Sequence, residues 1–130
     1  MRLAEVKDFL KAFHLFENYY IGSLDSKKRN SLGVYNLKRD NARHKAFGGN
    51  EKYGVKGIAL LIHGDTNKSH TEELAFKLYD RLDNLDDIRI GGKKIYFIEL
   101  LQDEPVDVDK DGNAVYEYVI EMNIYYERQE

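Results

Sequence analysis

The stretch NAVYEYVIEMNIYY, residues 113–126, alternates polar and apolar side chains. One parity carries the polar residues Glu117, Glu121 and Asn123. The other parity carries tyrosines and aliphatic residues, namely Tyr116, Tyr118, Ile120, Met122, Ile124 and Tyr126. A period of two is that of a β-strand, because successive side chains point to opposite faces of a sheet. The pattern therefore predicts a long strand, from Val115 to about Tyr126, that closes the fold.

The residues just before this strand, DVDKDG at 107–112, look like the first half of a calcium-binding loop. With Asp107 as position 1, acidic residues fall at positions 3 and 5 and a glycine at position 6. Position 12 should be a bidentate glutamate, but Tyr118 stands there, and a strand follows where a helix is needed. We therefore interpret residues 107–113 as a tight turn without tightly bound calcium, in which Asp and Asn bond their own backbone and Gly112 has a positive φ.

Composition narrows the class of protein. The chain has 130 residues, the size of one domain, and we expect a single domain over residues 1–130. No run approaches the ~18 apolar residues of a membrane helix, and the N-terminal MRLAEVKDFL lacks the apolar core of a signal peptide. With no cysteine and four histidines, a thiolate site is excluded and a zinc site would need carboxylate ligands.

Charge is distributed unevenly between the two halves of the chain. Residues 1–65 hold 12 Lys and Arg against 7 Asp and Glu, a net charge of +5. Residues 66–130 hold 8 against 16, a net charge of −8. Either each half presents a solvated surface, or the basic side of one subunit meets the acidic side of the next.

Two amphipathic helices are predicted. Apolar residues recur every three or four positions over residues 2–17, which indicates a helix with an aromatic face. The tetrapeptide SHTE at 69–72 reads as a capping box, and the leucines after it mark the buried face of a second helix ending near Asn84. We expect three of these leucines to pack on the apolar face of the preceding strand, that is Leu74, Leu78 and Leu82 against Ile58, Leu60 and Ile62.

The remaining elements are strands. Residues 19–24 and 32–37 suggest a hairpin with a long turn, and residues 55–63, apolar on both parities, suggest a central strand covered on both faces. Residues 88–90 and 94–101 flank two glycines, a short-hairpin signal. The order α-β-β-β-α-β-β-β indicates an α+β fold, with two helices packed on one twisted, mainly antiparallel sheet.

No motif supports catalysis. His63, Asp65 and His70 are close in sequence, but they lack helical spacing, so we expect no metal ligands among them. No serine stands in G-x-S-x-G, and neither glycine pair, at 48–49 or 91–92, is followed by the lysine of a phosphate-binding loop. We therefore expect no enzyme activity, no catalytic residue and no cofactor.

A basic run, KRDNARHK at residues 38–45, lies near Tyr35 and Phe47. Cations beside aromatic rings suit single-stranded nucleic acid. The isoelectric point of about 5.8, however, is far from the basic values of nucleic-acid modules. A solvated or inter-subunit loop is the preferred interpretation, and we expect no sequence-specific nucleic-acid partner.

The last strand is long for so small a domain. The fourteen residues from Asn113 to Tyr126 extend about 46 Å, whereas a compact domain of this size is roughly 36 Å across. The strand and its hairpin partner should therefore overhang the body or bend sharply. An overhanging tyrosine-rich hairpin is either an aggregation hazard or a docking arm, which points to assembly.

Several segments together resemble a known family. These are YYIGSL at 19–24, SLGVYNLKR at 31–39, KAFGG at 45–49, VKGIALLIHG at 55–64, IGGKKIYFIELLQDEPVDV at 90–108 and VYEYVIEMNIYYER at 115–128. In this order they resemble the minor capsid or tail-completion proteins of long-tailed phages and prophages, which act as tail terminators. The resemblance covers nearly the whole chain, and the ending is its most specific part.

The resemblance implies a small α+β subunit that forms a hexameric ring on the tail tube, stops tube polymerisation and faces the head connector. The partners would be copies of the chain, the tail tube protein and the head-tail connector protein, in a virion assembled in the host cytoplasm, with the genome passing through the ring. A head-tail adaptor or neck subunit, or a small calcium- or nucleic-acid-binding module, is the alternative. The residues expected at subunit interfaces are Tyr116, Tyr118, Tyr125, Tyr126, Lys38, Arg39 and Arg43.

Overall fold

The computed structural model describes residues 1–37 and 53–128. In chain order its elements are α1 (Leu3–Lys11), β1 (Asn18–Ile21), β2 (Ser31–Asn36), β3 (Tyr53–His63), α2 (Lys68–Asp83), β4 (Arg89–Ile90), β5 (Lys93–Leu100), β6 (Val106–Lys110) and β7 (Tyr116–Glu127). The α+β class with two helices is confirmed for the described residues. The predicted order lacked β6, which forms part of what was expected to be a turn.

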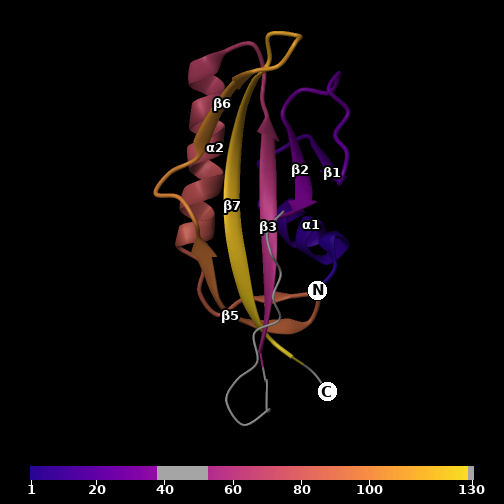
Figure 1. The fold of residues 1–130 in the computed structure, drawn as a ribbon, viewed down its shortest axis with the longest axis vertical. Helices are drawn as coiled ribbons and strands as arrows, with labels where there is room; N and C mark the ends of the chain where they lie inside the picture. The colour runs from indigo at the N-terminus through magenta and orange to yellow at the C-terminus, as the bar shows by residue number, and fades with distance from the viewer. Residues whose placement is uncertain (38–52, 129–130) are drawn as a thin grey trace.

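The long strands β3 and β7 form the spine of the molecule, and Figure 1 shows them side by side along its longest axis. They pair antiparallel over all of β3, from Tyr53 opposite Glu127 to His63 opposite Glu117. The sheet order is β1-β2-β3-β7-β5-β4, and β6 pairs with β7 as well. The sheet is mixed, because β1 and β2 are parallel while the other pairs are antiparallel.

The parallel β1–β2 pair corrects the predicted hairpin. Asn18 pairs with Ser31 and Ile21 with Val34, so both strands run in one direction. The polar segment at 22–30 therefore carries the chain back along the sheet instead of turning it directly. A parallel pair and an antiparallel hairpin would both show two apolar strand runs separated by a polar segment. The local sequence could therefore not distinguish the two arrangements.

Helix α1 is shorter than predicted. The backbone N–H of Arg2 donates to Glu5 Oε1 at 2.8 Å at its start. The helix ends at Lys11, and His14 has a φ of 55° that a helix cannot continue through. Phe13 and Phe16 are nevertheless buried. The helix was predicted too long because Phe13 and Phe16, which follow its end, also face the core and continue the apolar periodicity.

Helix α2 begins two residues before the predicted capping box. Asn67 is the N-cap, and its side-chain Oδ1 accepts from the backbone N–H of His70 at 3.1 Å. The capping box at 69–72 was therefore wrong, because Asn67 already satisfies this end of the helix. The predicted end near Asn84 is confirmed, since Asn84 is the C-cap.

The core lies between the two helices and one face of the sheet. Leu78 and Leu82 of α2 are buried in the same cluster as Ile58, Leu60 and Ile62 of β3, as predicted, and Leu74 is partly buried against it. Val6 and Leu10 of α1 belong to this cluster too. Both helices thus cover the same face of the sheet.

The opposite face of β3 corrects another prediction. Val55, Ala59 and Leu61 are only half-buried, although the sequence suggested a strand covered on both sides. Apolar residues on both parities indicated two covered faces, but neither helix lies on this one. We call it the open face, meaning the face opposite α1 and α2.

Of the two predicted turns that contain glycine, one is confirmed and the other lies at a different position. The β4–β5 hairpin is confirmed, with Gly91 and Gly92 at φ values of 58° and 78°. The aspartate-rich turn lies later than predicted, because 106–110 form β6 and the chain reverses around Asp111. Asp111 Oδ1 accepts backbone N–H groups of Asn113 at 2.8 Å and Val115 at 3.0 Å, an Asx-type turn as expected.

Positive φ angles in this region fall on Asp109 and Ala114, so the expectation for Gly112 was wrong. Asp107 and Asp109 lie on a strand and not in a loop between helices. The geometry of a helix-loop-helix calcium site is therefore absent from this segment.

The long strand β7 pairs with neighbouring strands along its length, with β3 on one side and β5 and β6 on the other. β3 matches it residue for residue, while β2 pairs only with residues 58–63 of β3. The end of the ladder near Tyr53 and Glu127 therefore extends past β2, and β5 borders it on the other side. Within residues 1–37 and 53–128, β3 and β7 do not extend from the sheet as a separate two-stranded arm.

Candidate functional site

An exposed group of aromatic side chains lies where the long ladder extends past β2. Tyr53 of β3, Phe97 of β5 and Tyr125 of β7 share the open face, as the pairing of Phe97 with Tyr125 and of Tyr53 with Glu127 requires. The rings of Phe97 and Tyr125 stack at 4.2 Å between centroids, and Tyr53 lies 6.4 Å from Tyr125. With Tyr96 they line a shallow hollow of about 370 Å³. We call these four residues the aromatic cluster.

The aromatic cluster results from an irregularity in β5. The register shifts between Ile95 and Phe97, so the neighbours Tyr96 and Phe97 are both exposed, at 47% and 54%. A regular strand would have turned one of them toward the helices. Adjacent exposed aromatic rings indicate a contact surface, because aromatic residues are enriched in the cores of protein interfaces.

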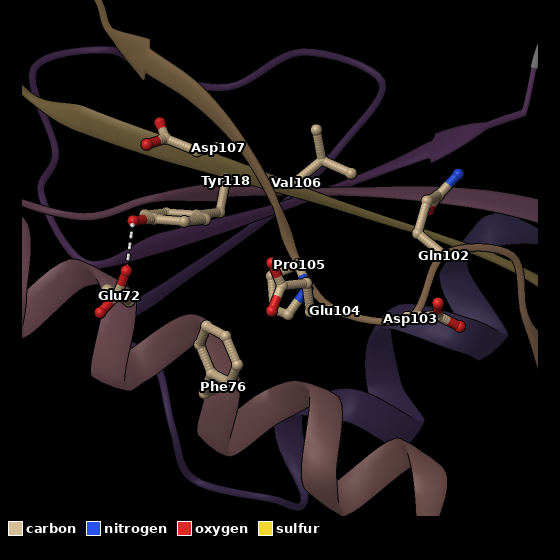
Figure 2. A pocket seen from close by; sticks show the side chains of 9 residues that line it. All are labelled: Glu72, Phe76, Gln102, Asp103, Glu104, Pro105, Val106, Asp107 and Tyr118. Atoms are coloured by element: carbon tan, nitrogen blue, oxygen red, sulfur yellow. Dashed lines mark hydrogen bonds between the residues drawn. The ribbon is translucent and has the colours of Figure 1, made fainter.

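A second hollow, of about 510 Å³, lies between α2 and β6. Figure 2 shows Glu72 and Phe76 of α2 on one side and the segment from Gln102 to Asp107 on the other. Its carboxylates come from Glu72, Asp103, Glu104 and Asp107. We call it the acidic groove.

The carboxylates of the acidic groove affect nearby side chains. Burial, together with Asp107 and Glu72, raises the pKa of Tyr118, whose hydroxyl donates to Glu72 Oε2 at 3.3 Å. Lys68 donates to Asp107 and holds the pKa of that carboxyl below its ordinary value. Burial and then Asp83 and Asp103 raise the pKa of Tyr79. The groove therefore suits a cationic partner.

The structure separates the histidines that the sequence placed together. His70 Nδ1 lies 2.6 Å from Asp65 Oδ2 on the surface. His63 is fully buried and contacts Glu117 and Ser26 instead. His63, Asp65 and His70 therefore do not form one cluster.

The predicted interface tyrosines occupy different environments. Tyr125 belongs to the aromatic cluster, whereas Tyr118 is 2% exposed and lies in the core. Tyr126 packs against the core, and Tyr116 is half-buried with the Lys68 ammonium 5.3 Å from its ring centroid. Of the four tyrosines, Tyr125 is the one that lines the hollow with the exposed rings of Tyr96 and Phe97. The predictions for Lys38, Arg39 and Arg43 lie outside the described residues.

Sequence reasoning missed Tyr53, Tyr96 and Phe97. A usable signal was present, since adjacent aromatic residues at 96–97 break the alternation of an otherwise regular strand. Their meeting with Tyr125 depends on the pairing of β5 with β7, which local periodicity does not specify.

Within residues 1–37 and 53–128, no helix has the length and apolar character required to cross a bilayer.

Comparison with protein families gives one match to nearly the whole chain. A family model described as the bacteriophage tail terminator protein matches residues 5–128. No match was found among curated proteins.

Proposed function

We propose a ring-forming role at the end of the phage tail for this chain, which belongs to the bacteriophage tail terminator family. Membership of this structural family makes the chain a component of the phage tail and hence of the virion. The proposal adds that six copies close into a ring on the tail tube. The ring stops tube polymerisation and presents a surface to the head connector, and it assembles in the host cytoplasm.

The aromatic cluster is the observation that carries this proposal. A closed ring of identical subunits needs two different surfaces on each subunit, because each contact is head-to-tail. The aromatic cluster supplies an apolar surface on the open face, with Phe97 54% exposed. The acidic groove lies elsewhere, between α2 and β6. The described part of the subunit thus offers two unlike surfaces.

The charge distribution supports a head-to-tail arrangement. The acidic groove belongs to the negative second half of the chain, while residues 1–65 carry a net charge of +5. We propose that basic side chains of one subunit approach the acidic groove of the next, and Lys38, Arg39 and Arg43 are the sequence candidates. Such contacts guide encounter and register more than they add affinity.

The first experiment measures assembly of the purified protein, alone and with tail tube protein, by native mass spectrometry and negative-stain imaging. We expect rings of six copies that stop growth of the tube. Phe97→Ser should prevent ring formation while leaving the circular dichroism of the subunit unchanged. The matched control is Ile21→Ser, which removes a 39% exposed side chain from the β1 edge of the sheet and should leave rings intact.

Charge is tested separately from apolar contact. The double variant Asp103→Lys and Glu104→Lys reverses two charges of the acidic groove and should weaken assembly most at low ionic strength. Raised salt should weaken wild-type assembly in the same direction, because exposed charges are screened beyond about 10 Å at 0.1 M. A protein that stays monomeric with tail tubes, or rings that survive Phe97→Ser, would contradict the proposal.

A head-tail adaptor or neck subunit is the second candidate, and the family description covers a tail role more directly. The two are distinguished by the partner that the ring binds first. A terminator ring binds purified tail tubes without connector protein, whereas an adaptor ring binds the connector without tubes.

A further inference from the structure

Three polar side chains meet at the end of the ladder opposite the aromatic cluster. His63 ends β3, Glu117 faces it from the start of β7, and Asp111 comes from the β6–β7 turn. His63 Nδ1 lies 2.8 Å from Glu117 Oε2 and 3.8 Å from Asp111 Oδ2. One ligand atom from each of the three lies within 4.8 Å of the others. We call this group the His63 cluster.

The second ring nitrogen of His63 determines what Nδ1 can do. Nε2 lies 3.0 Å from the backbone carbonyl oxygen of Ser26, in the 22–30 connection. A carbonyl only accepts, so Nε2 carries a proton and donates it. A histidine that binds a metal through one nitrogen almost always donates its other N–H to such an acceptor. The Ser26 carbonyl thus orients Nδ1 as a ligand.

The contact between His63 Nδ1 and Glu117 Oε2 requires either a bridging proton or a bound metal ion. The neutral ring that donates from Nε2 has a lone pair on Nδ1, and a lone pair 2.8 Å from a carboxylate oxygen is repulsive. Either a proton is shared between the two atoms, or both atoms bind a metal ion. The side chain of His63 is fully buried, so bulk water does not screen this arrangement.

Asp111 is held in position as a further ligand. Its Oδ1 accepts the backbone N–H groups of Asn113 and Val115, which leaves Oδ2 directed at the His63 side. The carboxylate is therefore fixed by its own turn.

We propose that the His63 cluster binds a divalent transition-metal ion of the zinc class, through His63 Nδ1 and one oxygen each of Asp111 and Glu117. An imidazole with two carboxylates suits such an ion, whereas calcium and magnesium prefer oxygen ligands alone. A small outward movement of Glu117 from His63, and a small inward movement of Asp111, would give ligand distances of ~2.0–2.2 Å, and water would complete the shell. The ion would fasten the 22–30 connection, the end of β3 and the β6–β7 turn together.

The surface pair His70–Asp65 provides a matched comparison within the same chain. It also has an imidazole nitrogen beside a carboxylate, at 2.6 Å, but the His70 side chain is 52% exposed. The metal-ligand group found among the described residues contains the His63 set and not this pair. Asp65→Asn therefore disrupts a histidine–carboxylate contact without touching the proposed ligands.

The test uses the full chain after removal of metals with a chelator. Zn²⁺ affinity is measured by competition with a chromophoric chelator, for the wild type, Asp111→Asn, Glu117→Gln and Asp65→Asn. Asp111→Asn keeps the oxygen that accepts from Asn113 and Val115, so the turn should persist. We expect one Zn²⁺ per chain at micromolar or tighter Kd, a loss of tenfold or more in each ligand variant, and a change below about twofold in Asp65→Asn.

A second measurement does not depend on the variants folding. In wild-type protein, imidazole nitrogen NMR should show Zn²⁺ shifting Nδ1 of His63 and leaving both nitrogens of His70 unchanged. Saturating Zn²⁺ should also raise the Tm by about 5 °C or more. Absence of saturable binding, equal affinity in the ligand variants, or a shift confined to His70 would overturn the site. These readouts are taken on the subunit, so they are independent of ring formation.

Discussion

The two ends of the open face are built from the same two strands, yet they differ in what covers them. At one end His63 and Glu117 face each other beneath the 22–30 connection, and His63 has no exposed side-chain surface. At the other end Tyr53 and Tyr125 form the aromatic cluster with Phe97, which is 54% exposed. In Figure 1 these are the upper and lower ends of β3 and β7.

The difference indicates that one end of the β3–β7 ladder contributes mainly to folding and the other mainly to association. His63 and Glu117 contact each other inside the subunit, so removal of either should affect folding first. Apolar rings at the aromatic end are not fully used within the subunit, so their removal should affect association first. Four substitutions or conditions test this division.

The largest effect is expected for His63→Ala. The change leaves Glu117 and the Ser26 carbonyl without their partner and opens a buried cavity, so the free energy of unfolding should fall by about 3–5 kcal/mol. Urea denaturation measures it. His70→Ala removes an exposed histidine–carboxylate contact and should cost less than about 1 kcal/mol. Equal costs for the two histidines would show that burial does not distinguish them.

Next in size is Gly54→Ala, at the aromatic end but on the covered face of the sheet. A Cβ on Gly54 would lie 2.4 Å from Cζ of Tyr126, so the ring must move from its place against the core. We expect a cost of about 1–3 kcal/mol by thermal denaturation. Gly112→Ala, in the turn near the His63 end, meets no atom within 4 Å and should cost less than about 0.5 kcal/mol.

A smaller effect on stability is expected for Phe97→Ala. The lost stack on Tyr125 should cost the subunit about 0.5–1.5 kcal/mol, while assembly should be lost altogether. Denaturation and native mass spectrometry, performed on the same sample, separate the two quantities. A cost above about 3 kcal/mol would mean that Phe97 belongs to the core, and the contrast between the two ends would then fail.

The smallest effect is expected for the loss of stability in acid. Asp65, which lies near the His63 end, should contribute to that loss. Burial opposes ionisation of Asp65, but the backbone N–H of Asn67 and the His70 ring hold its pKa below the ordinary 3.8. A depressed pKa stabilises the fold above the unfolded value, and this contribution is lost as pH falls through the folded value. Asp65→Asn should therefore reduce the loss of Tm between neutral pH and pH values below 3.8. If Tm falls with pH equally in the wild type and Asp65→Asn, then Asp65 does not contribute to the acid sensitivity of the fold.

The sequence predicted element types well where one period dominated a long run. The alternation of β7, the leucines of α2 and the two glycines of the β4–β5 turn are local signals, and each element formed. Predictions failed where a local pattern had two structural solutions. The β1–β2 pair proved parallel, α1 ended early at a left-handed His14, and Asn67 capped α2 ahead of the predicted box.

The candidate sites were less predictable than the elements. Tyr118 and Tyr125 belong to one tyrosine-rich strand, but their opposite parities place one in the core and the other in the aromatic cluster. Phe97 joins Tyr125 only through pairing between strands, and a register shift in β5 exposes it. The sequence alone therefore indicated tyrosines as interface residues but could not select among them.

By itself, the sequence determined the α+β class, the long closing strand and the resemblance to tail terminators, because these depend on periodicity and on the order of short segments. The tertiary structure decided which strands are neighbours and which face of the sheet the helices leave open. It also brought His63, Asp111 and Glu117 together from positions up to 54 residues apart. The physical reason is that side-chain periodicity is set within one element, whereas partner and register are set by packing between distant elements.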